Sequence, residues 1–222
     1  MNADTLRRWA PFAGALLLVQ SVLATVTAAL TEKRFAFDAL RAAGLKDDVA
    51  VADGSVGLLV KAGLVHTSTT HALVNAVGLA LVAVLWWRVN RPEDRGPLRA
   101  LVMLAIAVVT STAGFAVSFL AHNGYSGGAS AAAYGILGAV VGTTFALRAD
   151  LPAGRRLVAP AMLFVLSLMM LLVVLPNPAM DHAAHFGGWA AGLLAGVASQ
   201  RRGGRVALLT SAFVAIAVAA VA

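Results

Sequence analysis

Long apolar runs separated by short polar connections dominate the pattern of hydrophobic and polar positions along this chain. A helix needs about 20 apolar residues to cross a bilayer, because each residue adds about 1.5 Å to its length. The runs that approach this length are Pro11–Leu30, Ala62–Trp87, Ala100–Ala121, Ser126–Leu147, Leu157–Leu175, Ala183–Ser199 and Val206–Ala222. The alternating pattern of a membrane barrel is not visible, and lipid does not tolerate open strand edges. We therefore expect these runs to form transmembrane helices.

The composition places the chain in the same class, since 60% of its residues are hydrophobic and 12% are charged. Soluble domains carry about twice that share of charged residues. We therefore predict an all-α membrane protein with a single polytopic domain over residues 1–222. Pro11–Leu30 lacks a small-residue cleavage site followed by a polar chain, so we interpret it as a retained span and not a signal peptide. Val206–Ala222 has only 17 residues, which leaves a crossing helix and a surface-lying or partly inserted tail both open.

The basic residues form short clusters between the apolar runs, a pattern that favours orientation signals over binding to nucleic acid despite the net charge of +7. If every run crosses the membrane, 12 of the 17 basic residues lie on one side: Arg7, Arg8, Arg88, Arg91, Arg95, Arg99, Arg148, Arg155, Arg156, Arg201, Arg202 and Arg205. The positive-inside rule makes this side the cytoplasm. The loop Thr31–Lys61 balances five basic residues with five acids, so it argues only weakly against an external position. We expect a multi-pass plasma (inner) membrane protein with a cytoplasmic N-terminus and no nucleic-acid partner.

Polar groups inside apolar spans are costly and are candidates for function. His71 and Asn75 lie four residues apart on one face of the second run, while Ser130 and His185 lie near the starts of the fourth and sixth. In the predicted topology all four lie within roughly 10 Å of the outer membrane boundary. A serine hydroxyl becomes a good nucleophile beside a neutral imidazole. Asn75, His71 and the first backbone N–H of the fourth helix are suitable donors to the oxyanion of an acyl-transfer reaction.

Glycines recur on the helices that carry Ser130 and His185. The fourth run contains Gly128, Gly135, Gly138 and Gly142, and Gly188, Gly192 and Gly196 follow His185 at spacings of three, four and four. Small residues at such spacing let two helix backbones approach closely. A generic helix-packing motif and a packing that brings His185 against the helix of Ser130 both explain the pattern.

Three blocks of this sequence resemble the rhomboid family of intramembrane serine proteases. They are "HTSTTHALVN" (66–75), "GASAAAYGILGA" (128–139) and "HFGGWAAG" (185–192), in the family's order. The similarity covers roughly Trp9 to Ser199. It implies a rhomboid-like bundle of six transmembrane helices, with residues 206–222 as an additional seventh. It also implies a serine endopeptidase that needs no cofactor and cleaves transmembrane segments of other membrane proteins near the outer face of the bilayer.

The resemblance implies a role for each matching residue. Ser130 would be the nucleophile and His185 its general base, in a dyad without an acid. His71, Asn75 and the backbone N–H of Ser130 would form the oxyanion hole, and the catalytic set would be Ser130, His185, His71 and Asn75. Tyr134 would pack against the ring of His185.

Two further positions bear on the resemblance. His66 matches a histidine near the membrane surface in some members, where it holds loop structure. Ala131 departs from the family pattern, because glycine usually follows the serine, and we expect its methyl group to tighten the packing around Ser130.

Water and substrate both need access to such a site. The polar run His66–Thr70, together with His122, Asn123, Tyr125 and Ser126, is suited to line a hydrophilic cavity, although the end of any helix at the interface is polar. The fifth run, Leu157–Leu175, contributes no polar residue to the candidate site. It is either a movable gate for substrate or a plain lipid-facing helix.

Other functions remain open. A rhomboid-like adaptor or chaperone without proteolysis would share the fold. A haem-binding electron carrier would use His71 and His185 as axial ligands.

Two residues before His185 suggest other kinds of site. Asp181 could complete a catalytic triad, but its place at the end of a helix favours a solvated cap. The HxxH spacing of His182 and His185 is too weak a signal to predict a metal site.

Overall fold

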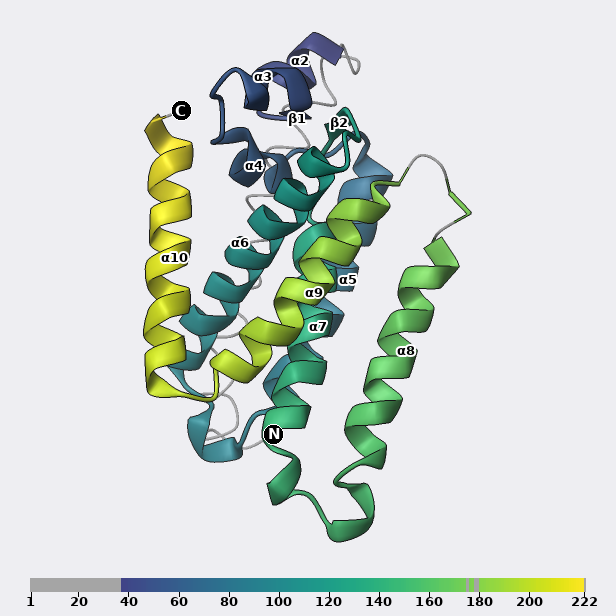
Figure 1. Ribbon diagram of the computed structural model, residues 1–222, viewed down its shortest axis with the longest axis vertical. Helices are drawn as coiled ribbons and strands as arrows, with labels where there is room; N and C mark the ends of the chain where they lie inside the picture. The colour runs from purple at the N-terminus through teal and green to yellow at the C-terminus, as the bar shows by residue number, and fades with distance from the viewer. Residues whose placement is uncertain (1–36, 175, 178–179, 222) are drawn as a thin grey trace.

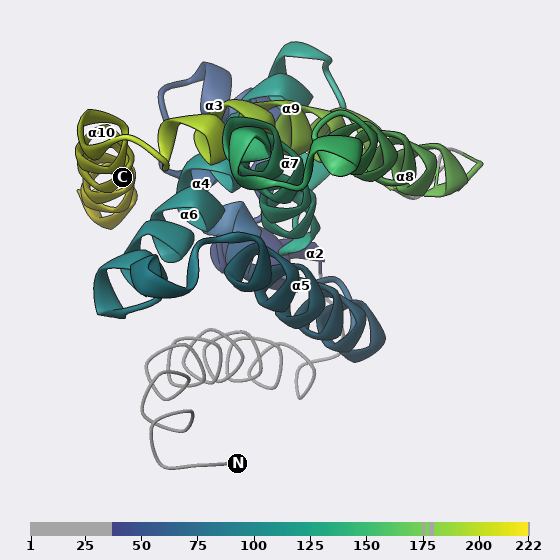
Figure 2. The same cartoon turned by 90° about the horizontal axis from the view of Figure 1, so that it is seen from below.

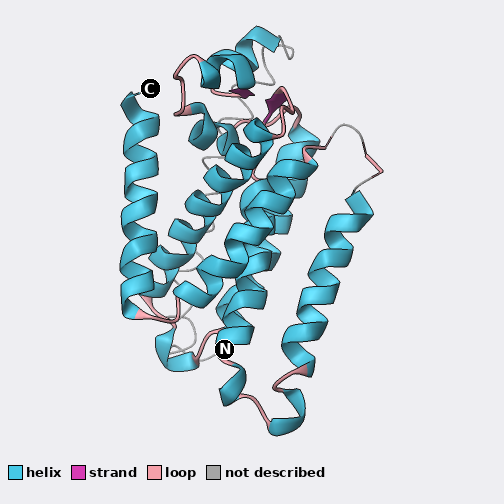
Figure 3. Cartoon of the chain, in the orientation of Figure 1, coloured by secondary structure: helices cyan, strands magenta, loops and turns pink. Residues whose placement is uncertain are grey.

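The computed structural model describes residues 37–174, 176–177 and 180–221, and most of these are helical (Figure 3). The helices and strands are α2 Phe37–Ala42, β1 Lys46–Asp47, α3 Asp48–Ala52, α4 Leu58–Lys61, η1 Ala62–Leu64, α5 Thr69–Val89, η2 Pro92–Asp94, α6 Pro97–Leu120, β2 Tyr125–Ser126, α7 Ser130–Ala146, η3 Arg148–Asp150, η4 Ala153–Arg155, α8 Val158–Val174, α9 His182–Ala198 and α10 Arg202–Val221. The predicted first span, Pro11–Leu30, and the basic residues Arg7 and Arg8 lie outside the described residues.

The described helices confirm an all-α membrane protein. Four segments are long and apolar enough to cross a membrane by length and composition: Thr70–Val89, Pro97–Leu120, Ala153–Leu172 and Arg202–Val221. The last of these is α10, whose 20 residues begin four positions before the predicted run. The short run at the end of the chain is therefore part of a helix of spanning length. The helices α7 and α9 have 17 residues each.

Two predicted starts were wrong. The second run begins at Thr69 and not at Ala62, because Ala62–Leu64 forms the separate turn η1 and Ala62 and Val65 are buried within the protein. These residues are apolar because they pack beneath a loop. Hydropathy cannot distinguish residues buried within the protein from residues that face lipid. The fourth run begins at Ser130 and not at Ser126, since Tyr125 and Ser126 form β2.

Helices α7 and α9 form the interior of the bundle, with α8 and α10 at opposite edges (Figures 1 and 2). Glycines of each helix face the backbone of the other. A Cβ atom on Gly138 or Gly142 would collide with a carbonyl oxygen of α9, and one on Gly192 or Gly196 with a carbonyl oxygen of α7. This packing brings the two helices into the close approach that their glycine spacing predicted.

One end of the bundle carries the arginine-rich connections 90–96, 147–157 and 199–201, and we call it the arginine end (Figure 1). Arg99 is buried there, with an exposed fraction of 3%. Its guanidinium lies 3.0 Å from the Asp94 carboxylate and donates a hydrogen bond of 3.1 Å to the carbonyl oxygen of Ser199. These partners let an arginine lie inside α6, because they satisfy a charge that would be costly to bury alone.

The opposite end, which we call the Ser130 end, carries the first loop and the connection 121–129 (Figure 1). Strand β1 of the first loop pairs with β2 in antiparallel register, with Lys46 opposite Ser126 and Asp47 opposite Tyr125. The Asp48 carboxylate accepts the Gly124 N–H at 2.7 Å and also binds the ammonium group of Lys46. The first loop is thereby fastened to the segment that leads into α7.

Candidate active site

Ser130 is the first residue of α7 and follows a loop that several backbone contacts hold in place. The N–H of Gly128 donates to the carbonyl oxygen of Ala62 at 2.9 Å, and the N–H of Ala129 donates to Nε2 of His66 at 3.2 Å. The first N–H groups of a helix have no partner within the helix. The backbone N–H of Ser130 therefore lies where a helix terminus favours negative charge.

His66 lies buried beneath this loop, outside the spanning helix α5. Its Nδ1 lies 3.3 Å from the carbonyl oxygen of Leu64. Since Nε2 accepts the Ala129 N–H, the proton of the neutral ring is on Nδ1 and is donated to Leu64. Burial lowers the pKa of His66 to about 4, with a further lowering from His71. A neutral His66 at pH 7 thus has the tautomer that holds the loop.

The side chains of Ser130 and His185 meet across the contact between α7 and α9. Nε2 of His185 lies 2.7 Å from Oγ of Ser130. The imidazole is buried, with an exposed fraction of 3%, and the ring of Tyr134 lies against it at a centroid distance of 4.6 Å and an angle of 30°. Nδ1 of His185 has no hydrogen-bond partner in the described part of the chain. A hydroxyl and an imidazole in this geometry can exchange a proton.

His71 and Asn75 face the same loop from α5. A Cβ atom on Gly128 would lie 2.7 Å from Cε1 of His71 and 3.0 Å from Nδ2 of Asn75, and Gly128 has a positive φ of 122°. Only glycine fits this conformation and this approach. Among the described residues Nδ2 of Asn75 is buried without a hydrogen-bond partner. A buried donor left unpaired costs about 1–3 kcal/mol, so this amide is a group held ready for an acceptor.

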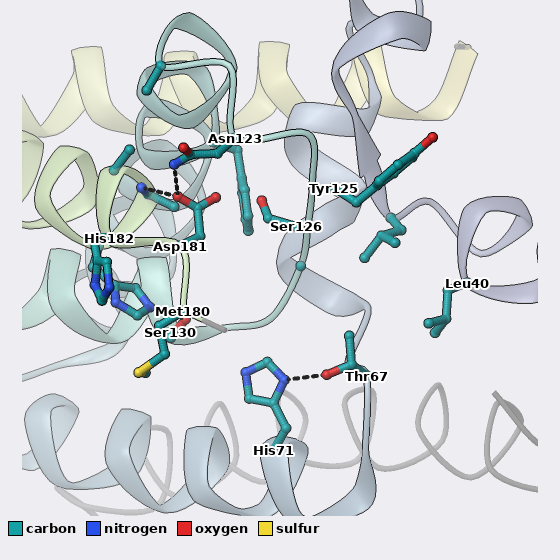
Figure 4. Close-up of a pocket in the computed structure, with 17 residues that line it drawn as sticks. Leu40, Thr67, His71, Asn123, Tyr125, Ser126, Ser130, Met180, Asp181 and His182 are labelled. Atoms are coloured by element: carbon teal, nitrogen blue, oxygen red, sulfur yellow. Dashed lines mark hydrogen bonds between the residues drawn. The ribbon is translucent and has the colours of Figure 1, made fainter. Parts of the chain in front are cut away.

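The four predicted site residues are thus brought together around one loop. His71 has a partner that the sequence did not point to, since its Nδ1 lies 3.2 Å from Oγ1 of Thr67 (Figure 4). Thr67 lies in the loop before Ser68, the N-cap of α5, so helical spacing could not indicate this contact.

A cavity of about 660 Å³ opens beside Ser130 and His185. Its polar lining includes Thr67, His71, Asn123, Tyr125, Ser126, Asp181 and His182 (Figure 4). The prediction of a hydrophilic lining is confirmed for Thr67, Asn123, Tyr125 and Ser126. It was wrong for His66, which is buried under the loop, and for Ser68, Thr70 and His122, which do not line the cavity.

Asp181 caps α9 but is not the solvated cap that the sequence suggested. It is partly buried, and its carboxylate accepts the Ala184 N–H and the Asn123 side-chain amide, each at 2.9 Å, and the Ser118 hydroxyl. Burial raises the pKa of Asp181, but these hydrogen bonds outweigh it and lower the pKa below its usual value. The carboxylate is not bonded to His185, so it does not take the position of a triad acid.

His182, the neighbour of Asp181, directs Nε2 to the carbonyl oxygen of Asn177 at 3.0 Å. This hydrogen bond joins the start of α9 to the connection before it.

Ala131 fits beside Ser130 because glycines face it. It is buried in a small cluster with Ala62, Phe115 and Ala184. A Cβ atom on Gly114 of α6 would lie 3.1 Å from the Ala131 methyl group. The Ala131 methyl group therefore occupies space that Gly114 leaves open. That it tightens the packing around Ser130 stays a prediction.

The family model of the rhomboid domain matches residues 54–202, which include Ser130, His185, His71 and Asn75. The chain belongs to the rhomboid family. A comparison with curated proteins gave no match. Some rhomboid-like proteins are inactive, so membership of the rhomboid family does not by itself assign a reaction to the chain. The matched region begins after α3 and ends at the start of α10.

Proposed function

We propose that this rhomboid-family protein is an intramembrane serine endopeptidase that cleaves transmembrane segments of other membrane proteins. The observation that carries the proposal is the 2.7 Å contact between Oγ of Ser130 and Nε2 of His185. The unpaired amide of Asn75 supports it, because this amide approaches Gly128, two residues before Ser130. An adaptor would need neither a paired hydroxyl and imidazole nor an unsatisfied buried donor beside them.

In the proposed reaction, Oγ of Ser130 attacks the carbonyl carbon of the scissile peptide bond while Nε2 of His185 takes the hydroxyl proton. The tetrahedral intermediate collapses as His185 gives that proton to the leaving amine. A water molecule then attacks the acyl-enzyme, with His185 again accepting a proton and returning it to Ser130. Nε2 must be unprotonated at the start, so the resting ring carries its hydrogen on Nδ1. Tyr134 holds the ring in place, since no carboxylate does.

The oxyanion formed in both steps requires hydrogen-bond donors already in position. We assign this role to Nδ2 of Asn75, the side chain of His71 and the backbone N–H of Ser130. His71 and Asn75 approach the same glycine, Gly128, two residues before the nucleophile. Their fixed position around the loop means that little reorganisation is needed when the charge develops.

The proposal includes an orientation and a route for substrate. The arginine end faces the cytoplasm of the plasma (inner) membrane by the positive-inside rule, so the Ser130 end faces outward. Water enters through the polar cavity of about 660 Å³. Substrate approaches from lipid past α8, which lies at the edge of the bundle and contacts the site region through the Tyr134 hydroxyl and the Met170 carbonyl oxygen, 3.4 Å apart.

The test is cleavage of a model single-pass membrane protein in liposomes. Wild-type protein should cleave it, and Ser130→Ala and His185→Ala should not. Ser111→Ala is the matched control, because Ser111 is buried in α6 with a hydroxyl that has no partner in the described chain. A wild-type protein that binds substrates without cleaving any would support the adaptor alternative. A haem absorption band in the purified protein would support the electron carrier.

A further inference from the structure

An apolar crevice of about 410 Å³ lies between α7, α8 and α9 in the half of the bundle toward the arginine end. Its lining is entirely apolar: Val141, Gly142, Phe145, Leu157, Pro160, Ala161, Phe164, Val165, Leu193, Leu194 and Val197. At the crevice, Gly142 lets α7 contact α9 closely. Helix α8 closes the crevice on its other side and is hydrogen-bonded to the pair, through Met170 to Tyr134 of α7 and through Ser167 to Trp189 of α9. Water would find no hydrogen-bond partners there. Inside a bilayer the occupant of such a space is a hydrocarbon chain.

Positive charge adjoins this crevice at the arginine end. The guanidinium carbon of Arg148 lies 4.3 Å from the centroid of the Phe145 ring, which lines the crevice. Arg155 and Arg156 directly precede Leu157, another lining residue.

These three arginines have no carboxylate partner among the described residues. The acid between them, Asp150, is paired with Arg91 at 2.6 Å. The neighbouring carboxylate is thus engaged elsewhere. Arg148 and Arg156 each donate one hydrogen bond to a backbone carbonyl oxygen, that of Phe145 and that of Leu151. These bonds leave other N–H donors and the positive charge of each guanidinium for an anionic ligand. A phosphate group suits them, because arginine binds phosphate oxygens through several N–H donors.

We propose that this crevice binds an anionic glycerophospholipid. One acyl chain fills the apolar space between α8 and the α7–α9 pair, and the phosphate group binds Arg148, Arg155 and Arg156. Free phosphate is a poorer fit, since it has nothing to place in an apolar crevice. The bound lipid bridges α8 to the interior of the bundle at the end away from Ser130, and it does so whether or not the protein is a protease.

The test is titration of delipidated protein in detergent, with bound lipid counted by native mass spectrometry. Phosphatidylglycerol and phosphatidylcholine with identical acyl chains are compared. One juxtamembrane arginine contributes about fivefold to the binding of an anionic lipid. Phosphatidylglycerol should therefore bind at least fivefold more tightly than phosphatidylcholine, and Arg148→Gln, Arg155→Gln and Arg156→Gln should each weaken its binding by about that factor.

Two further variants test the site against a general attraction to charge. Arg202→Gln is the matched control, because Arg202 begins α10 at the other edge of the bundle from α8, and it should leave affinity unchanged (Figure 1). Ala161→Phe fills the crevice and should displace both lipids. Equal affinity for the two lipids, an equal loss in Arg202→Gln, or full binding of phosphatidylglycerol to Ala161→Phe would overturn the proposal.

Discussion

Replacing Asn75 with leucine should change activity and stability in opposite directions. Nδ2 of Asn75 is buried and, within the described residues, has no hydrogen-bond partner. An unpaired buried donor costs the folded state about 1–3 kcal/mol, so a leucine of similar shape should raise the free energy of unfolding by about that amount. If the same amide binds the oxyanion, its loss should lower turnover by about 10²–10³, or about 2.7–4 kcal/mol of transition-state stabilisation.

The measurements are initial cleavage rates in liposomes and unfolding in detergent on the same preparations. Asn90 supplies the control, since it is also buried but lies directly after α5 at the arginine end, away from Ser130. It donates to the Trp86 carbonyl oxygen at 2.6 Å and accepts from Gln200 at 3.2 Å. Asn90→Leu should lower the free energy of unfolding and leave the turnover of folded protein unchanged. Turnover of Asn75→Leu at the wild-type rate, or a loss of stability equal to that of Asn90→Leu, would refute the reasoning.

Three further predictions concern the loop and the imidazole. Gly128→Ala should reduce turnover by at least about 10²-fold, because its Cβ atom would displace both oxyanion donors. Gly124→Ala is the control, because Gly124 also has a positive φ but has open space around it. This variant should cost only about 1–2 kcal/mol of stability. Tyr134→Phe should retain its turnover, because it keeps the ring that lies against His185. Tyr134→Ala should lose turnover by roughly 10- to 100-fold, which is part of what a positioned base supplies. Comparing the turnover of the two variants shows whether the ring positions His185. The pKa of His66 is lowered from 6.5 to about 4 in the folded protein. Between these two pH values the unfolded chain binds more protons than the folded one, so the free energy of unfolding decreases as the pH is lowered. Wild-type protein should lose about 2 kcal/mol more than His66→Gln between pH 7 and pH 5 in detergent unfolding, and equal losses would contradict the assignment.

The helices and the grouping of the site residues were predictable because membrane burial leaves a strong record in sequence. Ser130, His71, Asn75 and His185 stand out as polar groups inside apolar runs, and each lies near the same end of its helix. The glycines around His185 indicated which face of α9 meets α7, since only small residues permit that approach.

Other features left no such record. Ala62 and Val65 read as part of a span, although they pack under the Ser130 loop, because hydropathy does not separate burial in protein from burial in lipid. Arg99 reads as a residue outside the membrane, although an ion pair with Asp94 allows it inside α6. The pairing of β1 with β2 joins two-residue strands far apart in the chain, a separation at which short strands carry no detectable pattern.

The capping network of Asp181 belongs with these features. Its partners Ser118 and Asn123 come from the end of α6 and the connection after it. Neither polar residue is distinctive in sequence, so the network becomes visible only when the helix ends are placed in space.

The most direct test of the Ser130–His185 dyad is labelling with a fluorophosphonate, followed by peptide mass spectrometry of the membrane-reconstituted protein. Such a probe reacts with a serine whose hydroxyl is activated by a neighbouring base. We expect label on Ser130 of the wild-type protein and none on Ser130→Ala, with labelling of His185→Ala reduced at least about 10²-fold because the general base is missing. A wild-type protein that stays unlabelled, or a His185→Ala variant that is labelled as well as the wild type, would contradict the assignment of the dyad.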